Sequence, residues 1–306
     1  MANKSNYKTI QSISELHRMM GLSKPLHPLI SLINMDEVKA SQSERDITFV
    51  LNFYGISLKR NVQGKLKYGQ GYYDFDEGVL AMTEPYQILS VGRDENYKVS
   101  GWWLVFHPDF ILNYSLAKEI KSYGFFSYSV NEALHLSDRE ETQLEAIFIN
   151  ISLECDSTID QFSQDVMIAH LELLLTYCNR FYSRQFITRK SVHHDLLSNL
   201  DELLEAYFNS DFIRDNGVPS VQYFAERLNV SANYLTDMMR VLTGSTTQQH
   251  IHHKMIDMAK LKLSTTNLSV GEVAYQLGFE HPQSFNKFFK SKTNLTPVAF
   301  RSLFKN

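Results

Sequence analysis

Hydrophobic and polar residues alternate in two different ways along this chain, and the change falls near residue 137. Between about Ile30 and Phe110, short runs rich in β-branched and aromatic residues are separated by Gly, Pro, Asn and Asp. This pattern is typical of strands joined by turns. The runs cover residues 47–58, 65–76, 78–91 and 101–108. They predict an all-β domain of roughly a hundred residues, folded as a meander or a small barrel.

Helical periodicity begins at Ser137, first in residues 137–154 and again in residues 158–186. In the second stretch the apolar residues repeat with the spacing of one helix face. This stripe consists of Phe162, Val166, Ala169, Leu173 and Tyr177, widened by Ile159, Met167, Leu171 and Leu174. Such a face needs a partner, which is either the chain's own β domain or the same helices of a second subunit. We favour a role in a dimer.

The next residues, 186–195, are short of apolar side chains and mixed in charge, and they predict a linker. A further helical pattern follows in LLSNLDELLEAYFNS. The chain is therefore predicted to have four parts. They are a β domain in residues 1–136, a helical pair in 137–185, a linker in 186–195 and a helical domain in 196–306.

A helical hairpin is written twice within the predicted helical domain. The first copy is Ser220–Gly244 and the second is Ser269–Asn294. Apolar residues recur at an offset of 49 before the turn and of 50 after it, so one residue has been added inside the second turn. Ala225 and Ala274 supply the small side chain that two closely crossing helices need. Each copy is therefore predicted to be a helix-turn-helix, a unit that presents a few side chains to one major groove of DNA.

Local signals mark the ends of these helices. Ser269 and Glu272 form a capping-box sequence, and Gly278 stands where the first helix of the second copy must stop and turn. Between the copies, residues 246–263 keep apolar side chains on one helical face. A helix of this length spans on the order of 25 Å. It would hold the hairpins apart by a distance near one turn of DNA, about 34 Å.

A polar face remains once the apolar residues of each second helix are turned inward. Amide side chains can bond the N6 and N7 edge of adenine, and Lys can reach O6 and N7 of guanine, whereas basic residues beside them suit phosphates. The predicted base contacts are Asn233, Thr236, Asp237, Gln283, Asn286 and Lys287. The predicted phosphate contacts are Arg240, Lys254, Lys290 and Lys292. Phosphates repel Asp237, so the first copy is expected to read sequence more weakly than the second.

The distribution of charged residues also sets the C-terminal part apart from the rest of the chain. The net charge of the 306 residues is -4, but residues 217–306 carry ten Lys and Arg against five Asp and Glu. A basic segment of +5 on a body of -9 suggests an anionic partner for the C-terminal part only. The 43% hydrophobic and 21% charged residues are ordinary for globular domains, and the length allows two of them.

Targeting and redox signals are few. Cys155 and Cys178 are the only cysteines, too few for a disulfide framework, which fits a reduced compartment. The N-terminus lacks the apolar core of a signal peptide, and no run approaches the roughly 18 apolar residues of a membrane span. We expect a cytoplasmic protein without a membrane partner.

The second copy and its tail, LSVGEVAYQLGFEHPQSFNKFFKSKTNLTPVAFR, resemble the signature of the AraC/XylS family of bacterial transcription regulators. That signature contains I-x-E-[IV]-A, G-F, S-x-F-x-x-x-F-K, T-P and a closing F-R, and the resemblance extends over roughly residues 196–304. It implies two helix-turn-helix units that enter adjacent major grooves on one face of DNA. The six predicted base contacts occupy the positions from which this family reads bases. Asp237 departs from the basic or amide residue that is frequent there, and Asn294 replaces the usual glycine while still tolerating a left-handed conformation.

The same resemblance implies a multidomain α and β architecture. The N-terminal part would be a cupin-like sensing β-barrel with a helical pair, and the C-terminal part an all-α domain whose two units are joined by a long helix. A metal-binding cupin needs an H-x-H pair with further ligands. Only His17, His27 and His107 precede His135, and no two of them form an H-x-H pair, so neither a metal nor another cofactor is expected.

Other constellations carry less chemistry. His250, His252 and His253 show no fixed i, i+4 pair facing one way with a carboxylate, and no nucleophile signature occurs, so an enzyme is not expected. Aromatic residues of the strands form either plain core or an apolar effector pocket. The pocket candidates are Tyr54, Tyr68, Tyr73, Phe75, Trp102 and Phe106. Trp102 and Trp103 are adjacent in a strand and therefore point to opposite faces.

The expected function is that of a sequence-specific regulator of transcription, with promoter DNA and a second copy of the chain as partners. A small-molecule effector and RNA polymerase are further candidate partners. Two alternatives stay open on the sequence alone. One is a metal-independent cupin enzyme with a DNA-binding tail, and the other is a regulator whose N-terminal domain senses a protein.

Overall fold

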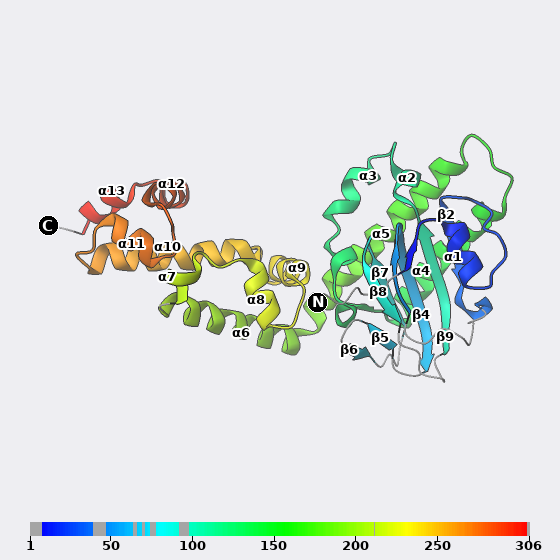
Figure 1. The fold of residues 1–306 in the computed structure, drawn as a ribbon, viewed down its shortest axis with the longest axis horizontal. Helices are drawn as coiled ribbons and strands as arrows, with labels where there is room; N and C mark the ends of the chain where they lie inside the picture. Colours follow the sequence, from blue (N-terminus) through cyan, green and yellow to red (C-terminus); the bar gives the residue numbers. More distant parts are fainter. Residues whose placement is uncertain are drawn as a thin grey trace, which may run out of the picture. The chain divides into compact units, whose positions relative to one another are not determined.

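The computed structural model describes residues 8–38, 47–63, 66–68, 71–73, 78–91, 98–210 and 212–304. The chain divides into two compact units, Met1–Gln185 and Phe186–Asn306. All of the described strands belong to the first unit, and every described element that lies wholly in the second unit is a helix (Figure 1). This confirms a β-rich N-terminal part and a helical C-terminal part.

A five-stranded antiparallel sheet organises the N-terminal unit, in the order β10-β7-β4-β9-β2. Its strands are β10 (Leu134–His135), β7 (Val79–Thr83), β4 (Tyr54–Gln63), β9 (Lys98–Phe106) and β2 (Ile30–Asn34). A second sheet contains β1 (Lys8–Ile10), β3 (Ile47–Leu51) and β8 (Ile88–Val91), with β1 and β3 parallel. The strands β5 (Leu66–Tyr68) and β6 (Gly71–Tyr73) form an antiparallel pair.

Successive side chains of β9 point to opposite faces of the sheet, so they pack in two different cores. Val105 and Trp103 pack with Phe49 of the three-stranded sheet and with α1 (Ile13–Met19). Leu104 points to the opposite face, where Leu58 of β4 is also fully buried. The five-stranded sheet is therefore covered on both faces.

Two long helices, α4 (Asp138–Asp156) and α5 (Ser163–Thr188), occupy the stretches that the helical periodicity predicted. Ser137 begins α4 with a capping box completed by Glu140. Glu145, farther along α4, accepts hydrogen bonds of 2.9 and 2.8 Å from Arg60 of β4. The same carboxylate also accepts a hydrogen bond from Trp102, and these contacts tie α4 to one face of the five-stranded sheet.

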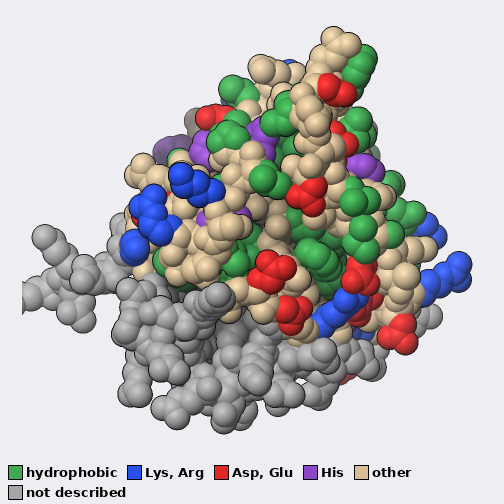
Figure 2. Space-filling view, turned by 90° about the vertical axis from the view of Figure 1, so that its right-hand side faces the viewer, with side chains coloured by type: hydrophobic (Ala, Val, Ile, Leu, Met, Phe, Trp, Pro, Cys, Tyr) green, Lys and Arg blue, Asp and Glu red, His purple; other side chains and the backbone are tan. Residues whose placement is uncertain are grey.

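The single apolar stripe predicted along α5 is in fact two stripes. Met167, Leu171 and Leu174 are buried, because they face the interior of the N-terminal unit. Phe162 and Leu173, by contrast, are 59% and 45% exposed. Positions four residues apart share a helix face and those one or two apart do not, so the wide stripe could not be buried as one surface. Figure 2 shows one face of the N-terminal unit, on which hydrophobic side chains lie among separate acidic ones.

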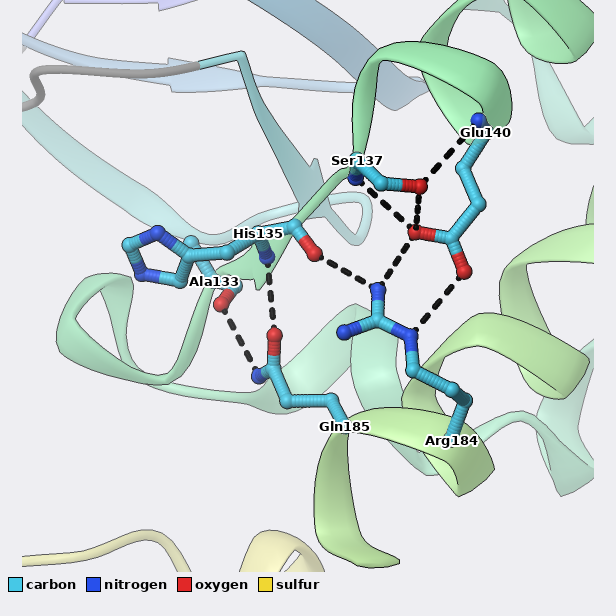
Figure 3. Close-up of polar contacts among 6 residues, drawn as sticks. All are labelled: Ala133, His135, Ser137, Glu140, Arg184 and Gln185. Carbon is cyan, nitrogen blue, oxygen red and sulfur yellow. Dashed lines mark hydrogen bonds and ion pairs between the residues drawn. The ribbon is translucent and has the colours of Figure 1, made fainter. Parts of the chain in front are cut away.

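A network of polar contacts ties the end of α5 to β10 and to the start of α4 (Figure 3). The Arg184 guanidinium donates to both carboxylate oxygens of Glu140, at 3.0 and 2.6 Å, and to the His135 carbonyl at 2.8 Å. Gln185 is 1% exposed; its amide oxygen accepts from His135 N, and its amide nitrogen donates to the Ala133 carbonyl. The charge-assisted bonds of Arg184 and the buried bonds of Gln185 together fix the last turn of the N-terminal unit.

The segment 186–195, expected to be a linker, is helical on either side of Arg189. Residues 186–188 end α5, and residues 190–195 begin α6 (Lys190–Asn209). His193 is buried there, with its ring between the Phe186 carbonyl and the Tyr234 hydroxyl at 2.8 and 3.0 Å. A low count of apolar residues predicted irregular chain, but one buried polar side chain with two partners anchors the helix.

The C-terminal unit contains two helical hairpins and the helix between them (Figure 1). The first hairpin is α8 (Val221–Arg227) and α9 (Ala232–Thr243), and the second is α11 (Val270–Gln276) and α12 (Pro282–Thr293). The joining helix is α10 (Thr247–Thr265), and α7 (Phe212–Asn216) and α13 (Pro297–Ser302) complete the unit. Among the residues described, no helix is both long and apolar enough to cross a lipid bilayer.

Candidate nucleic-acid interface

The first hairpin is built by caps and a small residue at the crossing. Ser220 accepts a hydrogen bond from Tyr223 N at the start of α8, and Ser231 accepts one from Tyr234 N at the start of α9, each at 3.2 Å. Such caps satisfy backbone N–H groups that have no partner inside the helix. Ala225 is fully buried where the helices cross, as its small size predicted.

The second hairpin follows the same plan with a different core. Ser269 and Glu272 form the predicted capping box, and the Ser269 contacts hold the pKa of the Glu272 carboxyl below its usual range. Phe285 and Phe289 of α12 are fully buried in a cluster with Ala274. Phe288, predicted to face inward with them, is only partly buried, because it lies toward α10 against the ring of His252.

The outward face of α12 is polar and open to solvent. Gln283, Asn286, Lys287 and Lys290 are all exposed, and their spacing of three and four residues places them on one side of the helix. Lys292 is exposed near the end of the same helix. This face therefore carries two amides and two ammonium groups opposite a core of phenylalanines.

The outward face of α9 differs in charge and exposure. Asn233 is exposed, whereas Thr236 and Asp237 are half-buried. Arg240 donates a hydrogen bond of 2.6 Å to the carboxylate of Asp237, one turn earlier on the helix. The two charges cancel locally, so α9 presents no net charge from this pair, and the side chain expected to contact phosphate is engaged by the carboxylate that phosphate would repel.

Lys254, the remaining predicted phosphate contact, lies on α10 and pairs with Glu205 of α6. The Lys254 ammonium holds the pKa of the Glu205 carboxyl below its usual range. This contact connects the joining helix to the helix that precedes the first hairpin. The structure thus groups Lys290 and Lys292 on α12 but places Lys254 in a surface ion pair with Glu205.

Sequence reasoning missed His281, which stands immediately before α12. It is exposed, and its side chain makes no capping hydrogen bond. At the offset of 50 it is the counterpart of Ser231, whose side chain caps α9. Aligning the two copies of the hairpin in the sequence would therefore have identified His281 as the residue at the start of α12. His281 therefore adds an exposed polar side chain at the start of α12.

The histidines of α10 have local partners. The His250 ring lies 2.9 Å from the Thr243 hydroxyl, and the His252 ring lies 2.9 Å from the Gln248 amide. Burial lowers the pKa of both rings below the ordinary value of histidine. Within the described ranges, no group of three or more His, Cys, Asp or Glu side chains is arranged to hold a metal ion.

The aromatic residues proposed for an effector pocket are only partly brought together. Tyr54 stacks on Phe106 with ring centroids 5.2 Å apart, and burial raises its pKa above the ordinary value of tyrosine. Trp102 lies on the same face of β9 as Phe106, the face tied to α4, while Trp103 faces the second sheet. Tyr68 and Tyr73 lie in β5 and β6, and Phe75 falls outside the described residues.

Comparison with known proteins supports the prediction that the C-terminal unit contains helix-turn-helix hairpins. Residues 224–302 match the sequence model of a family described as a helix-turn-helix domain. An uncharacterized HTH-type transcriptional regulator in the cgkA 5' region of Pseudoalteromonas carrageenovora is 30% identical over 100 residues. That match covers 33% of this chain, which spans only 57% of the length of the relative.

Similarity also extends beyond the hairpins. The uncharacterized HTH-type transcriptional regulator YfiF of Bacillus subtilis is 21% identical over 299 residues, which cover 92% of each chain. Among solved structures, the C-terminal domain of the two-component response regulator yesN from Fusobacterium nucleatum is 30% identical. It covers 34% of this chain and 98% of its own, with a TM-score of 0.28.

The paired hairpins, the joining helix and the matched residues agree with one another. The signature in the second hairpin predicted this family from sequence, and the matches confirm it. The C-terminal unit contains a helix-turn-helix domain of the AraC type, similar to those of HTH-type transcriptional regulators.

Proposed function

We propose that the C-terminal unit binds promoter DNA in a sequence-specific manner, with α12 reading bases in one major groove and α9 anchoring in the next. The observation that carries this proposal is the outward face of α12, where Gln283, Asn286 and Lys287 stand exposed opposite a phenylalanine core. Amide and ammonium groups on a rigid helix suit the edges of adenine and guanine. Lys290 and Lys292 lie beside them to hold phosphates and fix the register.

The test is selection of duplexes from a random-sequence library by the full-length chain, followed by footprinting on the enriched site. The expected footprint has two protected segments about 34 Å apart, one helical turn of DNA. A variant with Gln283, Asn286 and Lys287 replaced by Ala should keep its helical content but lose preference for that site. The proposal is wrong if no sequence is enriched, or if this variant enriches the same sequence as the unmodified chain.

The N-terminal unit would act as a cupin-like sensing domain. We place the effector at a small cavity between β7, the turns after β9 and α5, which would have to open to admit a metabolite. It is lined by Ala81, Met82, Thr83, Gln87, Phe125, Tyr128, Ser129, Ala133 and Tyr182. The hydroxyl of Thr83 is buried and has no hydrogen-bond partner in the described part of the chain. We propose that a bound ligand would supply this missing partner.

Thermal-shift screening of the full chain against metabolites tests the sensing role. A hit should raise the midpoint of unfolding in the unmodified protein and much less in Thr83→Val, which keeps the shape of the side chain but removes the hydroxyl. An equal shift in both proteins would place the ligand elsewhere. The metabolite should also change the affinity for the selected DNA, because an effector regulates only by binding one state more tightly than another.

A second copy of the chain is the proposed partner of the exposed stripe on α4 and α5. Ile149 and Leu153 of α4 are 44% and 62% exposed, and Phe162, Val166 and Leu173 continue the apolar surface at and along α5. Exposed apolar surface on paired helices is typical of a subunit interface, and dimers suit DNA sites with two-fold symmetry. Leu173→Glu should convert a dimer into a monomer in sedimentation, whereas Leu26→Glu, at a residue 67% exposed, should not.

A further inference from the structure

The two hairpins each contain two backbone positions in the left-handed region, and glycine and asparagine exchange places between them. The turn of the first hairpin has Asn229 at φ 55°, where the second has Gly278 at φ 80°. The end of α9 has Gly244 at φ 75°, where the end of α12 has Asn294 at φ 60°. Each conformation is thus occupied once by a residue that carries a Cβ atom.

The two turns are also hydrogen-bonded in the same way. Asn229 N donates to the Glu226 carbonyl at 3.2 Å, and Gly278 N donates to the Tyr275 carbonyl at 3.1 Å. Asparagine adopts the left-handed region more readily than most residues. The backbone conformation alone therefore does not require glycine at position 278, since the matching turn accepts Asn229.

Glycine is required at position 278 because the backbone of another segment lies too close for a Cβ atom. A Cβ atom at Gly278 would lie 2.6 Å from the carbonyl carbon of Gly217 and 2.9 Å from both its oxygen and the nitrogen of Val218. These are backbone atoms, which cannot move aside as the end of a flexible side chain can. A Cβ atom at Gly244, by comparison, would meet nothing within 4 Å. Of the two left-handed glycines in the hairpins, Gly278 is therefore the one that another chain segment approaches closely.

Each side of this contact is attached to a different hairpin. The carbonyl of Gly217 accepts a hydrogen bond of 2.9 Å from the hydroxyl of Tyr207. The ring of Tyr207 packs edge-on against Tyr223 and Phe224, so Gly217 is attached to the core of the first hairpin. Gly278 follows directly on Leu277, which is buried in the core of the second. Figure 1 shows α7, which ends just before Gly217, beside the second hairpin.

We propose that the backbone contact between Gly217 and Gly278 fixes the position of the second hairpin relative to the first, and with it the spacing of the two DNA segments that the chain reads. The proposal rests on the DNA-binding function proposed above. The helix α10 alone is a single link, and long helices bend. A second link between residues far apart in the sequence closes the arrangement and removes that freedom.

A fixed position of the second hairpin raises its effective concentration at the DNA once the first hairpin has bound. Two modules joined rigidly at the right distance gain about 10²- to 10⁴-fold over either one alone, and that gain falls when the geometry is lost. Gly278→Asn keeps a residue suited to the turn but pushes the two backbones apart. It should weaken binding to the selected DNA by about tenfold or more through loss of part of this gain. Gly244→Asn is the matched control, and its binding should stay close to that of the unmodified chain.

Spacing variants of the selected site give the decisive comparison. One base pair inserted between the two protected segments moves the second by about 3.4 Å and turns it by about 35°. The unmodified chain and Gly244→Asn should lose affinity steeply with each insertion, whereas Gly278→Asn should show a flatter profile. Equal profiles for all three proteins, together with specific binding by the unmodified chain, would overturn the proposal and leave the DNA-binding function intact.

A measurement without DNA tests the role of the Gly217–Gly278 contact separately from the DNA-binding function. Spin labels at Gln222→Cys on α8 and Tyr275→Cys on α11 report the distance between the hairpins, since both positions are exposed. Cys155→Ser removes the half-buried native thiol, and Cys178 is fully buried. With labelled chain diluted in unlabelled protein, pulsed EPR should give one narrow distance distribution for the unmodified backbone and Gly244→Asn. It should be broader or shifted in Gly278→Asn, and an unchanged distribution would refute the contact's role.

Discussion

The two hairpins of the C-terminal unit share a framework but differ in what they bury and in what they display. The first packs Leu235 and Met239 inside and turns an ion pair of Asp237 and Arg240 outward. The second packs Phe285 and Phe289 inside, and two amides and two lysines remain exposed. The comparison shows that duplicated scaffolds keep caps and crossings, because these define the fold, while the outward face is free to change its chemistry.

The cores offer the largest test of this difference. Phe289→Ala should cost about 3–5 kcal/mol of unfolding free energy, because a buried ring is lost and a cavity remains. Met239→Ala in the first hairpin should cost less, toward the lower end of about 2–5 kcal/mol, since the neighbouring side chains can fill the smaller space. Denaturant unfolding of the full chain, followed by circular dichroism at helical wavelengths, gives both values. Equal costs would remove the distinction between an aromatic and an aliphatic core.

The outward faces come next. Lys287→Ala should weaken binding to the selected DNA by about 1–3 kcal/mol and relax the base preference at one position, whereas Lys290→Ala should weaken all sequences alike. Asn233→Ala, the corresponding change in the first hairpin, should have the smaller effect on sequence preference, since α9 is expected chiefly to anchor. Binding titrations on selected and random duplexes at one salt concentration make the comparison. A loss for Asn233→Ala that exceeds the loss for Lys287→Ala would reverse the order of the two hairpins.

The framework could be predicted from sequence because local signals specify it. The capping box of Ser269 and Glu272, the alanines at the crossings and the inward apolar residues are consequences of helical periodicity and backbone hydrogen bonding. The predicted outward residues of α12 are exposed for the same reason. That Asp237 weakens base reading by the first hairpin stays a prediction, and the sequence did not indicate that Arg240 would pair with it.

What could not be predicted depends on contacts between distant segments. Lys254 was expected at phosphate, but Glu205 comes close to it only when α6 packs on α10. The helical start at His193 depends on Tyr234, a residue of another helix. In the N-terminal unit, the face on which Trp102 lies follows from strand register, which no turn signal in the sequence fixes. The reason for Gly278 is a backbone far away in the chain.

Helix caps give a smaller and more selective test. Ser231→Ala should lower stability by about 1 kcal/mol, because the Tyr234 N–H at the start of α9 loses its side-chain acceptor. His281→Ala at the matching position should leave stability almost unchanged, since the His281 side chain caps nothing. Any effect of His281→Ala should instead be seen in DNA binding. Similar losses of stability in the two variants would mean that His281 supports α12 by another contact.

The ion pair of α9 should have a still smaller effect. Exposed pairs of this kind contribute about 0.2–1 kcal/mol, so Asp237→Asn should change the unfolding free energy little. The same substitution frees Arg240 and removes a negative charge near the DNA backbone. Non-specific binding should therefore become tighter and more sensitive to salt. Measured salt dependence that stays the same in Asp237→Asn would show that Arg240 does not face phosphate even when released.

The smallest expected difference between the hairpins is a dependence on pH. His193 contacts Tyr234 of the first hairpin, and burial, together with the nearby charge of Arg189, lowers its pKa below the ordinary value of histidine. The unfolded chain therefore binds a proton more readily than the folded one. This contribution to stability is complete above the unfolded pKa of about 6.5 and is lost as the pH falls through the lowered folded pKa. The pKa values of His27, His250 and His252 are lowered as well, so the contribution of His193 must be obtained by difference.

His193→Gln, which keeps an amide for both partners but does not titrate, should lose less stability than the unmodified chain between pH 7 and pH 5. Parallel stability curves for the two proteins would mean that the first hairpin is no more sensitive to acid than the second.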